Sequence, residues 1–162
     1  MTEQPDNQVD GAEGYAVRVA ATLCRRSEGL RLTPYLCPAG VPTIGYGSTR
    51  YADGRAVTLK DPPITRQQAD ELLLLTLKRD YLPGLLKASP GLADQPKALA
   101  ALLDFVYNLG VARYEGSTLR KRIDAKDWAG ALVEIRKWNK AGGKVLPGLV
   151  ARRAAEAALL DT

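Results

Sequence analysis

Hydrophobic residues recur at helical spacing through most of this chain. Between residues 95 and 109 the apolar side chains of Leu99, Leu102, Leu103 and Val106 lie three or four positions apart. This spacing puts them on one face of a helix, because an α-helix turns once every 3.6 residues. The pattern therefore predicts an amphipathic helix over residues 95–109.

Similar spacing, together with helix start and stop signals, predicts five further helices. They cover residues 15–30, 65–84, 117–124 and 127–140, and a last one begins at 147. Thr65 and Gln68 have the spacing of a capping box, and Ser117 is placed to cap the helix that follows it. Pro147 suits a first helical turn, where its missing N–H costs nothing. The two tryptophans, Trp128 and Trp138, fall at positions that a core would use.

Residues 35–59 lack helical spacing and contain frequent Gly and Pro, so we expect a small antiparallel sheet there. Asp53-Gly54 is a strong hairpin signal between the short runs 49–51 and 56–58. A sheet followed by a run of helices is typical of an α+β fold. The length of 162 residues suits one domain, which we place at residues 15–162.

Residues 1–14 are polar and acidic, and they predict a flexible tail rather than a packed element. The segment has no positive start and no apolar run, so it does not resemble a signal peptide. No stretch of the chain approaches the roughly 18 consecutive apolar residues that a membrane-spanning helix needs. We therefore expect no membrane insertion. The protein should accumulate in the cytoplasm.

The chain carries a formal net charge of +5, and the charge is unevenly distributed. Residues 1–14 hold four acidic and no basic side chains, which leaves +9 on residues 15–162. Such a surplus favours an anionic partner, either nucleic acid or a bacterial envelope. No nucleic-acid-binding motif is visible and the basic residues are scattered. The charge alone is compatible with both partners.

Residue usage also bears on metals, cofactors and disulfides. The chain has no His, and its two cysteines, Cys24 and Cys37, are not spaced as metal ligands. We therefore expect neither a metal nor another cofactor. Two cysteines in a chain without an export signal argue against a structural disulfide. Cys24 is interpreted as a small buried apolar residue.

The stretch from 27 to 47 holds the candidate chemistry. Glu28 lies near the end of the first predicted helix, and an isolated Glu in that position is usually just solvated. The Pro and Gly residues after it, however, predict an irregular hairpin that folds back over the helix end. That hairpin would bring Cys37 and Thr43 towards Glu28. A carboxylic acid facing a second polar group across a cleft is what glycoside hydrolysis requires.

Several motifs in this chain resemble those of one family. They are EGL at residues 28–30, Tyr35, Gly40, TIGYG at 43–47, FVYNLG at 105–110, GSTL at 116–119 and GGKVLPGLV at 142–150, followed by Arg152 and Arg153. Together they resemble the phage-type lysozymes, the muramidases that phages use as endolysins, over roughly residues 15 to 162. The chain departs from the family pattern at Cys37, where Asp is frequent, and at Ser48, where some members carry His.

The resemblance implies a fold and an activity. The fold would be α+β and lysozyme-like, with a helix-plus-antiparallel-sheet lobe at about 15–62 and a larger helical lobe at 65–162. A linking helix starting near 65 would join the lobes, and a cleft would lie between them. The activity would be hydrolysis of the β-1,4 bond between N-acetylmuramic acid and N-acetylglucosamine in peptidoglycan. We expect a monomer, no nucleic-acid partner, and release through a separate membrane-lesion protein.

The resemblance also assigns residue roles. Glu28 would be the general acid, protonated at working pH because partial desolvation favours the neutral form. Thr43 would position the attacking water, and Cys37 stands where the family has its second acidic group. Three further residues are candidate substrate contacts: Ser48, Tyr107 and Thr118.

Three roles are open for Cys37: a thiolate base or nucleophile, a neutral group that holds the water together with Thr43, or a bystander in a dead site. A free thiol has a pKa of about 8.5, and no cation in residues 35–46 would lower it. The neutral role is therefore predicted. Two other classes of function stay open, a wall-binding domain without catalysis and a basic nucleic-acid-binding helical domain.

Overall fold

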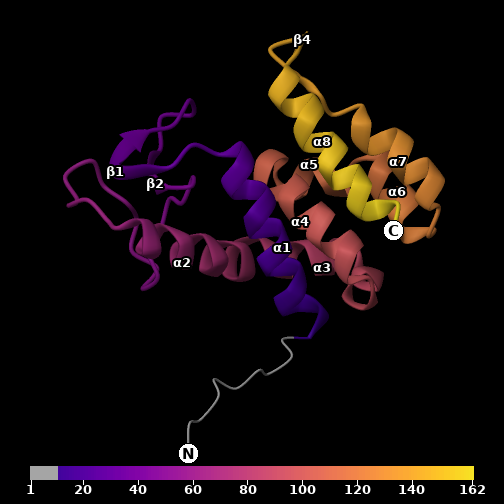
Figure 1. Ribbon diagram of the computed structural model, residues 1–162, viewed down its shortest axis with the longest axis horizontal. Helices are drawn as coiled ribbons and strands as arrows, with labels where there is room; N and C mark the ends of the chain where they lie inside the picture. The colour runs from indigo at the N-terminus through magenta and orange to yellow at the C-terminus, as the bar shows by residue number, and fades with distance from the viewer. Residues whose placement is uncertain (1–10) are drawn as a thin grey trace, which may run out of the picture.

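The computed structural model describes residues 11–162, which form two groups of elements around the first helix (Figure 1). A small sheet lies on one side of that helix, and most of the other helices lie on the other side. The tail predicted for residues 1–14 falls mostly outside the described residues. Its last part is helical, because helix α1 spans Ala12–Ser27 and so begins three residues earlier than predicted.

One face of helix α1 packs closely against another helix. Its buried residues are mostly small, and they pack against helix α4, which spans Pro96–Leu109. The helix was predicted to run to residue 30, but it ends at Ser27. Glu28 already has an extended backbone, with φ −91° and ψ 138°, although its N–H still donates to the carbonyl of Cys24. The chain leaves the helix here because the first strand begins at Arg31, and the poor helix propensity of Gly29 assists this exit. Glu28 therefore lies at the junction of helix and sheet.

The sheet is shorter than predicted and starts earlier. Strands β1 (Arg31–Leu36) and β2 (Pro42–Gly45) pair antiparallel, with Tyr35 opposite Thr43. The segment after β2 was predicted to continue the sheet, but it forms turns. There Asp53-Gly54 makes the expected reversal, closed by a single bridge between Arg50 and Ala56. The Asp61 carboxylate holds these turns together, because it accepts hydrogen bonds from the Tyr51 hydroxyl, the Thr58 N–H and the Thr58 hydroxyl.

The long helix that follows the sheet has the predicted cap, and a π-helical turn interrupts it close to Pro83, where an end or a kink is expected. It consists of α2 (Arg66–Thr76), the π-helical turn η1 (Leu77–Tyr81) and α3 (Leu82–Ala88). Thr65 and Gln68 form the capping box: the Gln68 N–H donates to Thr65 Oγ1 at 3.1 Å, and the Thr65 N–H donates to Gln68 Oε1 at 2.8 Å. The π turn lies directly before Pro83, which has no N–H to continue an α-helical ladder.

Helix α4 is the centre of the helical lobe. Every residue from Ala98 to Val106 is buried, because α1 covers one side of α4 and α8 (Pro147–Leu160) covers another. The predicted apolar face therefore covers only part of the buried surface of α4. The remaining helical elements are η2 (Pro90–Asp94), α5 (Val111–Glu115), α6 (Thr118–Asp124) and α7 (Trp128–Arg136). As predicted, Ser117 caps α6 and both tryptophans pack against the core.

The segment between α7 and α8 differs from the prediction. Helix α7 ends at Arg136, four residues early, and a hairpin follows in which β3 (Lys140–Ala141) pairs with β4 (Lys144–Val145). Gly142 and Gly143 join the strands with φ of +58° and +78°. Two successive positive φ angles are what a tight two-residue hairpin turn demands, and glycine supplies them at little cost.

Candidate active site

Glu28 lies in a pocket between the end of α1 and the start of α8. The pocket has a volume of about 560 Å³, and its walls include Leu23, Leu149 and Arg152. The Glu28 side chain is 30% exposed, so it is accessible to a ligand while part of its surface is packed. Arg152 Nη1 donates to Glu28 Oε1 at 2.7 Å. A carboxylate at the edge of a pocket, with one oxygen held by a cation, has the accessibility that a catalytic acid needs.

Arg152 is itself held in place by a buried carboxylate, Asp104. Its Nε and Nη2 donate to the two oxygens of Asp104 at 2.9 and 2.8 Å, and Asp104 is completely buried. Burial opposes the charge of Arg152, but Asp104 and then Glu28 raise its pKa above the ordinary value. The guanidinium is therefore charged. This fork leaves Nη1 free to reach Glu28.

Cys24 extends the same cluster. Its thiol is fully buried, as predicted, and it donates to Asp104 Oδ1 at 3.1 Å. Burial raises the pKa of the Cys24 thiol, and the nearby Asp104 carboxylate raises it further. Cys24 therefore remains a neutral donor that helps to satisfy Asp104, in addition to filling space in the core.

Cys37 lies in the turn of the β1–β2 hairpin, and Thr43 lies in strand β2 just after that turn. The Cys37 N–H donates to the carbonyl of Val41 at 3.1 Å, and the Gly40 N–H donates to the carbonyl of Cys37 at 2.8 Å. Thr43 is buried, and its hydroxyl donates to the same Val41 carbonyl at 2.9 Å. The hairpin thus holds Cys37 and Thr43 around one short turn.

Tyr35 connects the hairpin with Glu28 electrostatically. It stands opposite Thr43 in the sheet, and the Arg31 guanidinium lies over its ring at 4.6 Å. Burial raises the pKa of Tyr35, and the charge of Glu28 and then that of Cys37 add to the effect. The Tyr35 hydroxyl is therefore within electrostatic reach of both candidate catalytic groups.

The three predicted substrate contacts differ in their surroundings. Ser48 is only 1% exposed, and its hydroxyl is hydrogen-bonded to Thr76 Oγ1 at 3.1 Å. The Ser48 side chain is thus bonded within the protein and shielded from solvent, and its role as a substrate contact stays a prediction. The Tyr107 hydroxyl donates to the Tyr46 carbonyl and so ties α4 to the sheet. Thr118 is exposed at the start of α6, and its role in substrate binding stays a prediction.

Gly47 shows how closely Tyr107 approaches the hairpin. The residue has φ +102°, and a Cβ atom there would lie 2.9 Å from the Tyr107 hydroxyl oxygen. Any side chain at this position would be strained and would displace Tyr107. The last glycine of the TIGYG motif is thus required by the contact between the sheet and α4.

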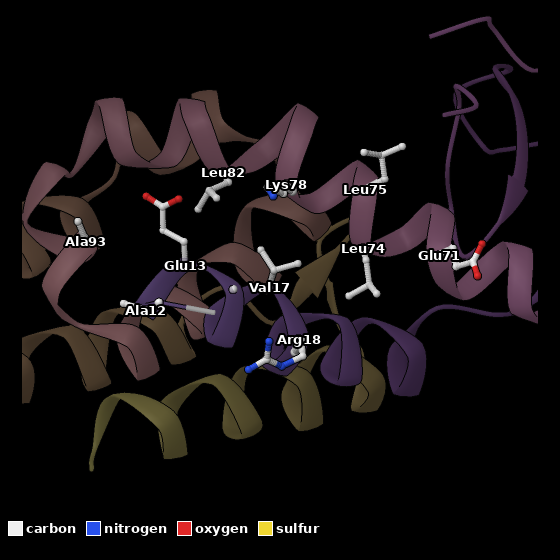
Figure 2. A pocket seen from close by; sticks show the side chains of 12 residues that line it. Ala12, Glu13, Val17, Arg18, Glu71, Leu74, Leu75, Lys78, Leu82 and Ala93 are labelled. Carbon is white, nitrogen blue, oxygen red and sulfur yellow. The ribbon is translucent and has the colours of Figure 1, made fainter. Parts of the chain in front are cut away.

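A second cavity lies away from Glu28, between the first half of α1 and the α2–α3 helix (Figure 2). Its volume is about 730 Å³, and Val17, Leu74 and Lys78 are among the residues that line it. It contains none of the predicted site residues.

Among residues 11–162, no group of three or more His, Cys, Asp or Glu side chains is placed to hold a metal ion.

Comparison with known proteins decides the family. A sequence model of the phage lysozyme family matches residues 25–156. The chain belongs to the phage lysozyme family. It is 36% identical over 144 residues to an endolysin of Acyrthosiphon pisum secondary endosymbiont phage 1, covering 86% of this chain and 93% of that one. It is 34% identical over 140 residues to the endolysin of Salmonella phage P22, covering 85% and 92%.

Solved structures of phage lysozymes confirm the α+β lysozyme-like fold. An endolysin from Escherichia coli O157:H7 phage FAHEc1 superposes with a TM-score of 0.71 at 31% identity, covering 88% of this chain and 90% of that one. A structure of phage P22 lysozyme gives a TM-score of 0.70 at 28% identity, covering 88% and 95%. The predicted fold class and family are therefore correct.

The phage lysozyme site differs from the sequence-based expectation in the environment of Cys37. The pKa of this thiol lies below its ordinary value, chiefly through a backbone hydrogen bond at Val41. Slight desolvation opposes the shift, while the backbone at Ala39 and the Thr43 side chain add to it. The expectation that only a cation could lower this pKa is wrong. The Arg152 guanidinium is bonded to Glu28 and Asp104.

The lowered pKa makes the role of Cys37 testable through pH. If Cys37 acts as a neutral group beside Thr43, Cys37→Ser should keep substantial activity and Cys37→Asp should keep or raise it. A thiolate catalyst would instead make the wild-type rate climb as the pH rises through the thiol pKa, because the thiolate forms above it. The measurement is the hydrolysis rate of all three proteins from about pH 6 to about pH 9. Loss of all activity in Cys37→Ser, or a covalent sugar–Cys37 adduct in mass spectra, would make sulfur the catalyst.

Proposed function

We propose that this chain is an endolysin-type muramidase, which hydrolyses the β-1,4 bond between N-acetylmuramic acid and N-acetylglucosamine during host cell lysis. Membership of the phage lysozyme family makes it a glycoside hydrolase that acts on peptidoglycan. The observation that carries the residue assignment is the position of Glu28. It is a partly exposed carboxyl at the edge of a pocket, held by a fixed guanidinium.

In the proposed mechanism Glu28 protonates the oxygen of the leaving sugar as the glycosidic bond breaks. Positive charge then develops on the ring of the other sugar, and the oxygen of water bonds to the ring carbon from which the leaving oxygen departed. The proton that the water loses goes to solvent, and Glu28 regains one from solvent, so the acid is restored. Thr43 and Cys37 hold that water from the hairpin. The Thr43 hydroxyl already donates to the Val41 carbonyl, so its oxygen lone pairs are the part left to accept a hydrogen bond from water.

The proposal also covers the partners of the protein and its location before lysis. We infer that the chain works as a monomer on peptidoglycan, without binding nucleic acid. It would remain in the host cytoplasm until a separate membrane-lesion protein gives it access to the periplasm. Within residues 11–162, the structure contains no helix with both the length and the apolar character to cross a membrane. A SAR-endolysin of Bacteriophage PS119 is 35% identical to this chain over 133 residues, which cover 80% of this chain and 73% of that protein.

Turbidity of Gram-negative cells tests the function and the release together. Cells that produce the protein alone should stay intact, and they should clear once chloroform permeabilises the inner membrane. Pelleting of the protein with cell walls without clearing would support a wall-binding domain instead. Gel-shift activity without clearing would support a nucleic-acid-binding protein. Spontaneous lysis during expression would contradict the proposed need for a separate membrane-lesion protein.

A further inference from the structure

The Arg152 guanidinium binds two carboxylates that differ in solvent exposure. Arg152 binds Asp104 through Nε and Nη2 and binds Glu28 through Nη1. The Asp104 side chain is 0% exposed, whereas that of Glu28 is 30% exposed. Asp104 is therefore the permanent partner of Arg152, and Glu28 is the partner that solvent and substrate can reach.

A second buried pair lies next to the first. Arg153 and Glu156 are 1% and 0% exposed, and Arg153 Nη2 donates to Glu156 Oε2 at 3.0 Å. Burial raises the pKa of Glu156, and the neighbouring Asp104 raises it further. Burial alone would also raise the pKa of Asp104, but Arg152 lowers it below the ordinary value. Asp104 therefore carries the charge, and Glu156 carries the proton.

We infer that Asp104 is a positioning residue for the general acid: it orients Arg152 towards Glu28 and offsets the charge of the guanidinium. This inference rests on the proposed function of Glu28. Asp104 does not touch the substrate pocket, because it is fully buried on α4. Its effect on the reaction passes through Arg152.

The orientation of the proton follows from the hydrogen bonds. Arginine can only donate, so the Glu28 oxygen that faces Nη1 must accept. That oxygen is Oε1. In the acid form of Glu28 the carbonyl oxygen is the stronger acceptor, so a carbonyl at Oε1 and a hydroxyl at Oε2 is the arrangement that the contact with Nη1 favours. The contact with Arg152 thus selects the oxygen that donates to the glycosidic bond.

The charge balance explains why two carboxylates are needed. A single charged guanidinium at 2.7 Å would favour the ionised form of Glu28 and disfavour a general acid. Because Asp104 already pairs with the same guanidinium, the positive charge that Glu28 experiences is largely offset. Asp104 thereby offsets the charge of the guanidinium without loosening the hydrogen bond that orients Glu28.

In the wild-type protein, the other titratable groups around the two carboxylates do not offset the charge of the Arg152 guanidinium. Those facing Glu28 or Asp104 from the surrounding elements are Cys24, Tyr35, Tyr81, Tyr107, Arg152, Arg153 and Glu156. Burial raises the pKa of Cys24 and of the three tyrosines, so they stay neutral in the working range. Only Glu156 could replace the negative charge of Asp104, because it would ionise more readily once Asp104 is neutral.

The test compares Asp104→Asn, Glu156→Gln and the double variant by the pH dependence of hydrolysis. Loss of the Asp104 charge should make Glu28 ionise at lower pH, so the basic limb of the activity profile should move down. We expect a shift of about one pH unit in the double variant. Asp104→Asn alone should shift less, because Glu156 can take over the charge. Asp61→Asn, which removes a hydrogen-bonded carboxylate in the other lobe, should leave the profile unchanged.

A folded double variant with the wild-type profile would overturn the inference. So would a uniform loss of rate at every pH, because that result indicates a purely structural role. If the double variant does not fold, Arg152→Lys provides the test. Lysine keeps the charge but cannot bind Asp104 and Glu28 as a fork, so kcat should fall with little change in KM. Wild-type kcat in Arg152→Lys would overturn the inference, whereas an inactive wild-type protein would refute the proposed function itself.

Discussion

Glu28→Gln should reduce peptidoglycan hydrolysis by about 10²–10⁴-fold while the protein stays folded. Glutamine has the shape of glutamate, and its carbonyl oxygen can still accept from Arg152 Nη1. It cannot, however, donate a proton to the leaving oxygen. The fold should survive because Glu28 lies at the helix end and is partly exposed. The measurement is the initial rate of hydrolysis together with the melting temperature.

Glu71→Gln is the matched control for this experiment. Glu71 is an exposed glutamate on α2 that lines the second cavity, away from Glu28. Its variant should hydrolyse peptidoglycan at the wild-type rate. If Glu28→Gln kept more than about a tenth of the wild-type rate, Glu28 would not be the general acid.

Thr43→Val should also cause a large loss, of about 10²-fold in kcat. Valine has nearly the same shape and a high β-propensity, so strand β2 should form as before. The variant lacks the hydroxyl that is bonded to the Val41 carbonyl and that would accept a hydrogen bond from the attacking water. Hydrolysis of a soluble peptidoglycan fragment would show the loss in kcat.

Thr33→Val, at an exposed position in β1, provides the comparison for Thr43→Val. It makes the same chemical change in the same sheet, so an effect common to both variants would be a general effect on the strands. A Thr43→Val enzyme with nearly wild-type kcat would mean that the water is held by other groups.

Features controlled by neighbours in the sequence were predicted most accurately. The capping box at Thr65 and the cap at Ser117 depend on residues three positions apart, and both form as expected. The Asp53-Gly54 reversal is similarly local. Each of these signals contains both partners of the interaction within a few residues, so no tertiary information was needed.

Element boundaries were less accurate where packing competes with propensity. Helix α1 ends at Ser27 because the chain turns into the sheet there. Helix α4 is buried on more than its predicted face because two other helices cover it. The β3–β4 hairpin was interpreted as a loop, although the Gly142-Gly143 pair at its turn is the signal that could have identified it.

The site was predictable only in part. Glu28, Cys37 and Thr43 lie within sixteen residues in the chain, and their spacing was recognisable. The contact between Glu28 and Arg152 joins residues 124 positions apart. Asp104 lies in the middle of an apolar helix, where a lone carboxylate was itself a signal that a buried cation must face it. The hydrogen bond between Ser48 and Thr76 likewise joins two different elements.

The most direct test of the central claim is the chemistry of the cleaved bond. Purified peptidoglycan would be digested with the protein, reduced with borohydride, and its fragments analysed by mass spectrometry. A muramidase leaves N-acetylmuramic acid at the new reducing end, so the fragments should end in its reduced form, and digestion with Glu28→Gln should yield almost none. Fragments ending in reduced N-acetylglucosamine, or glycan strands left intact, would contradict the account.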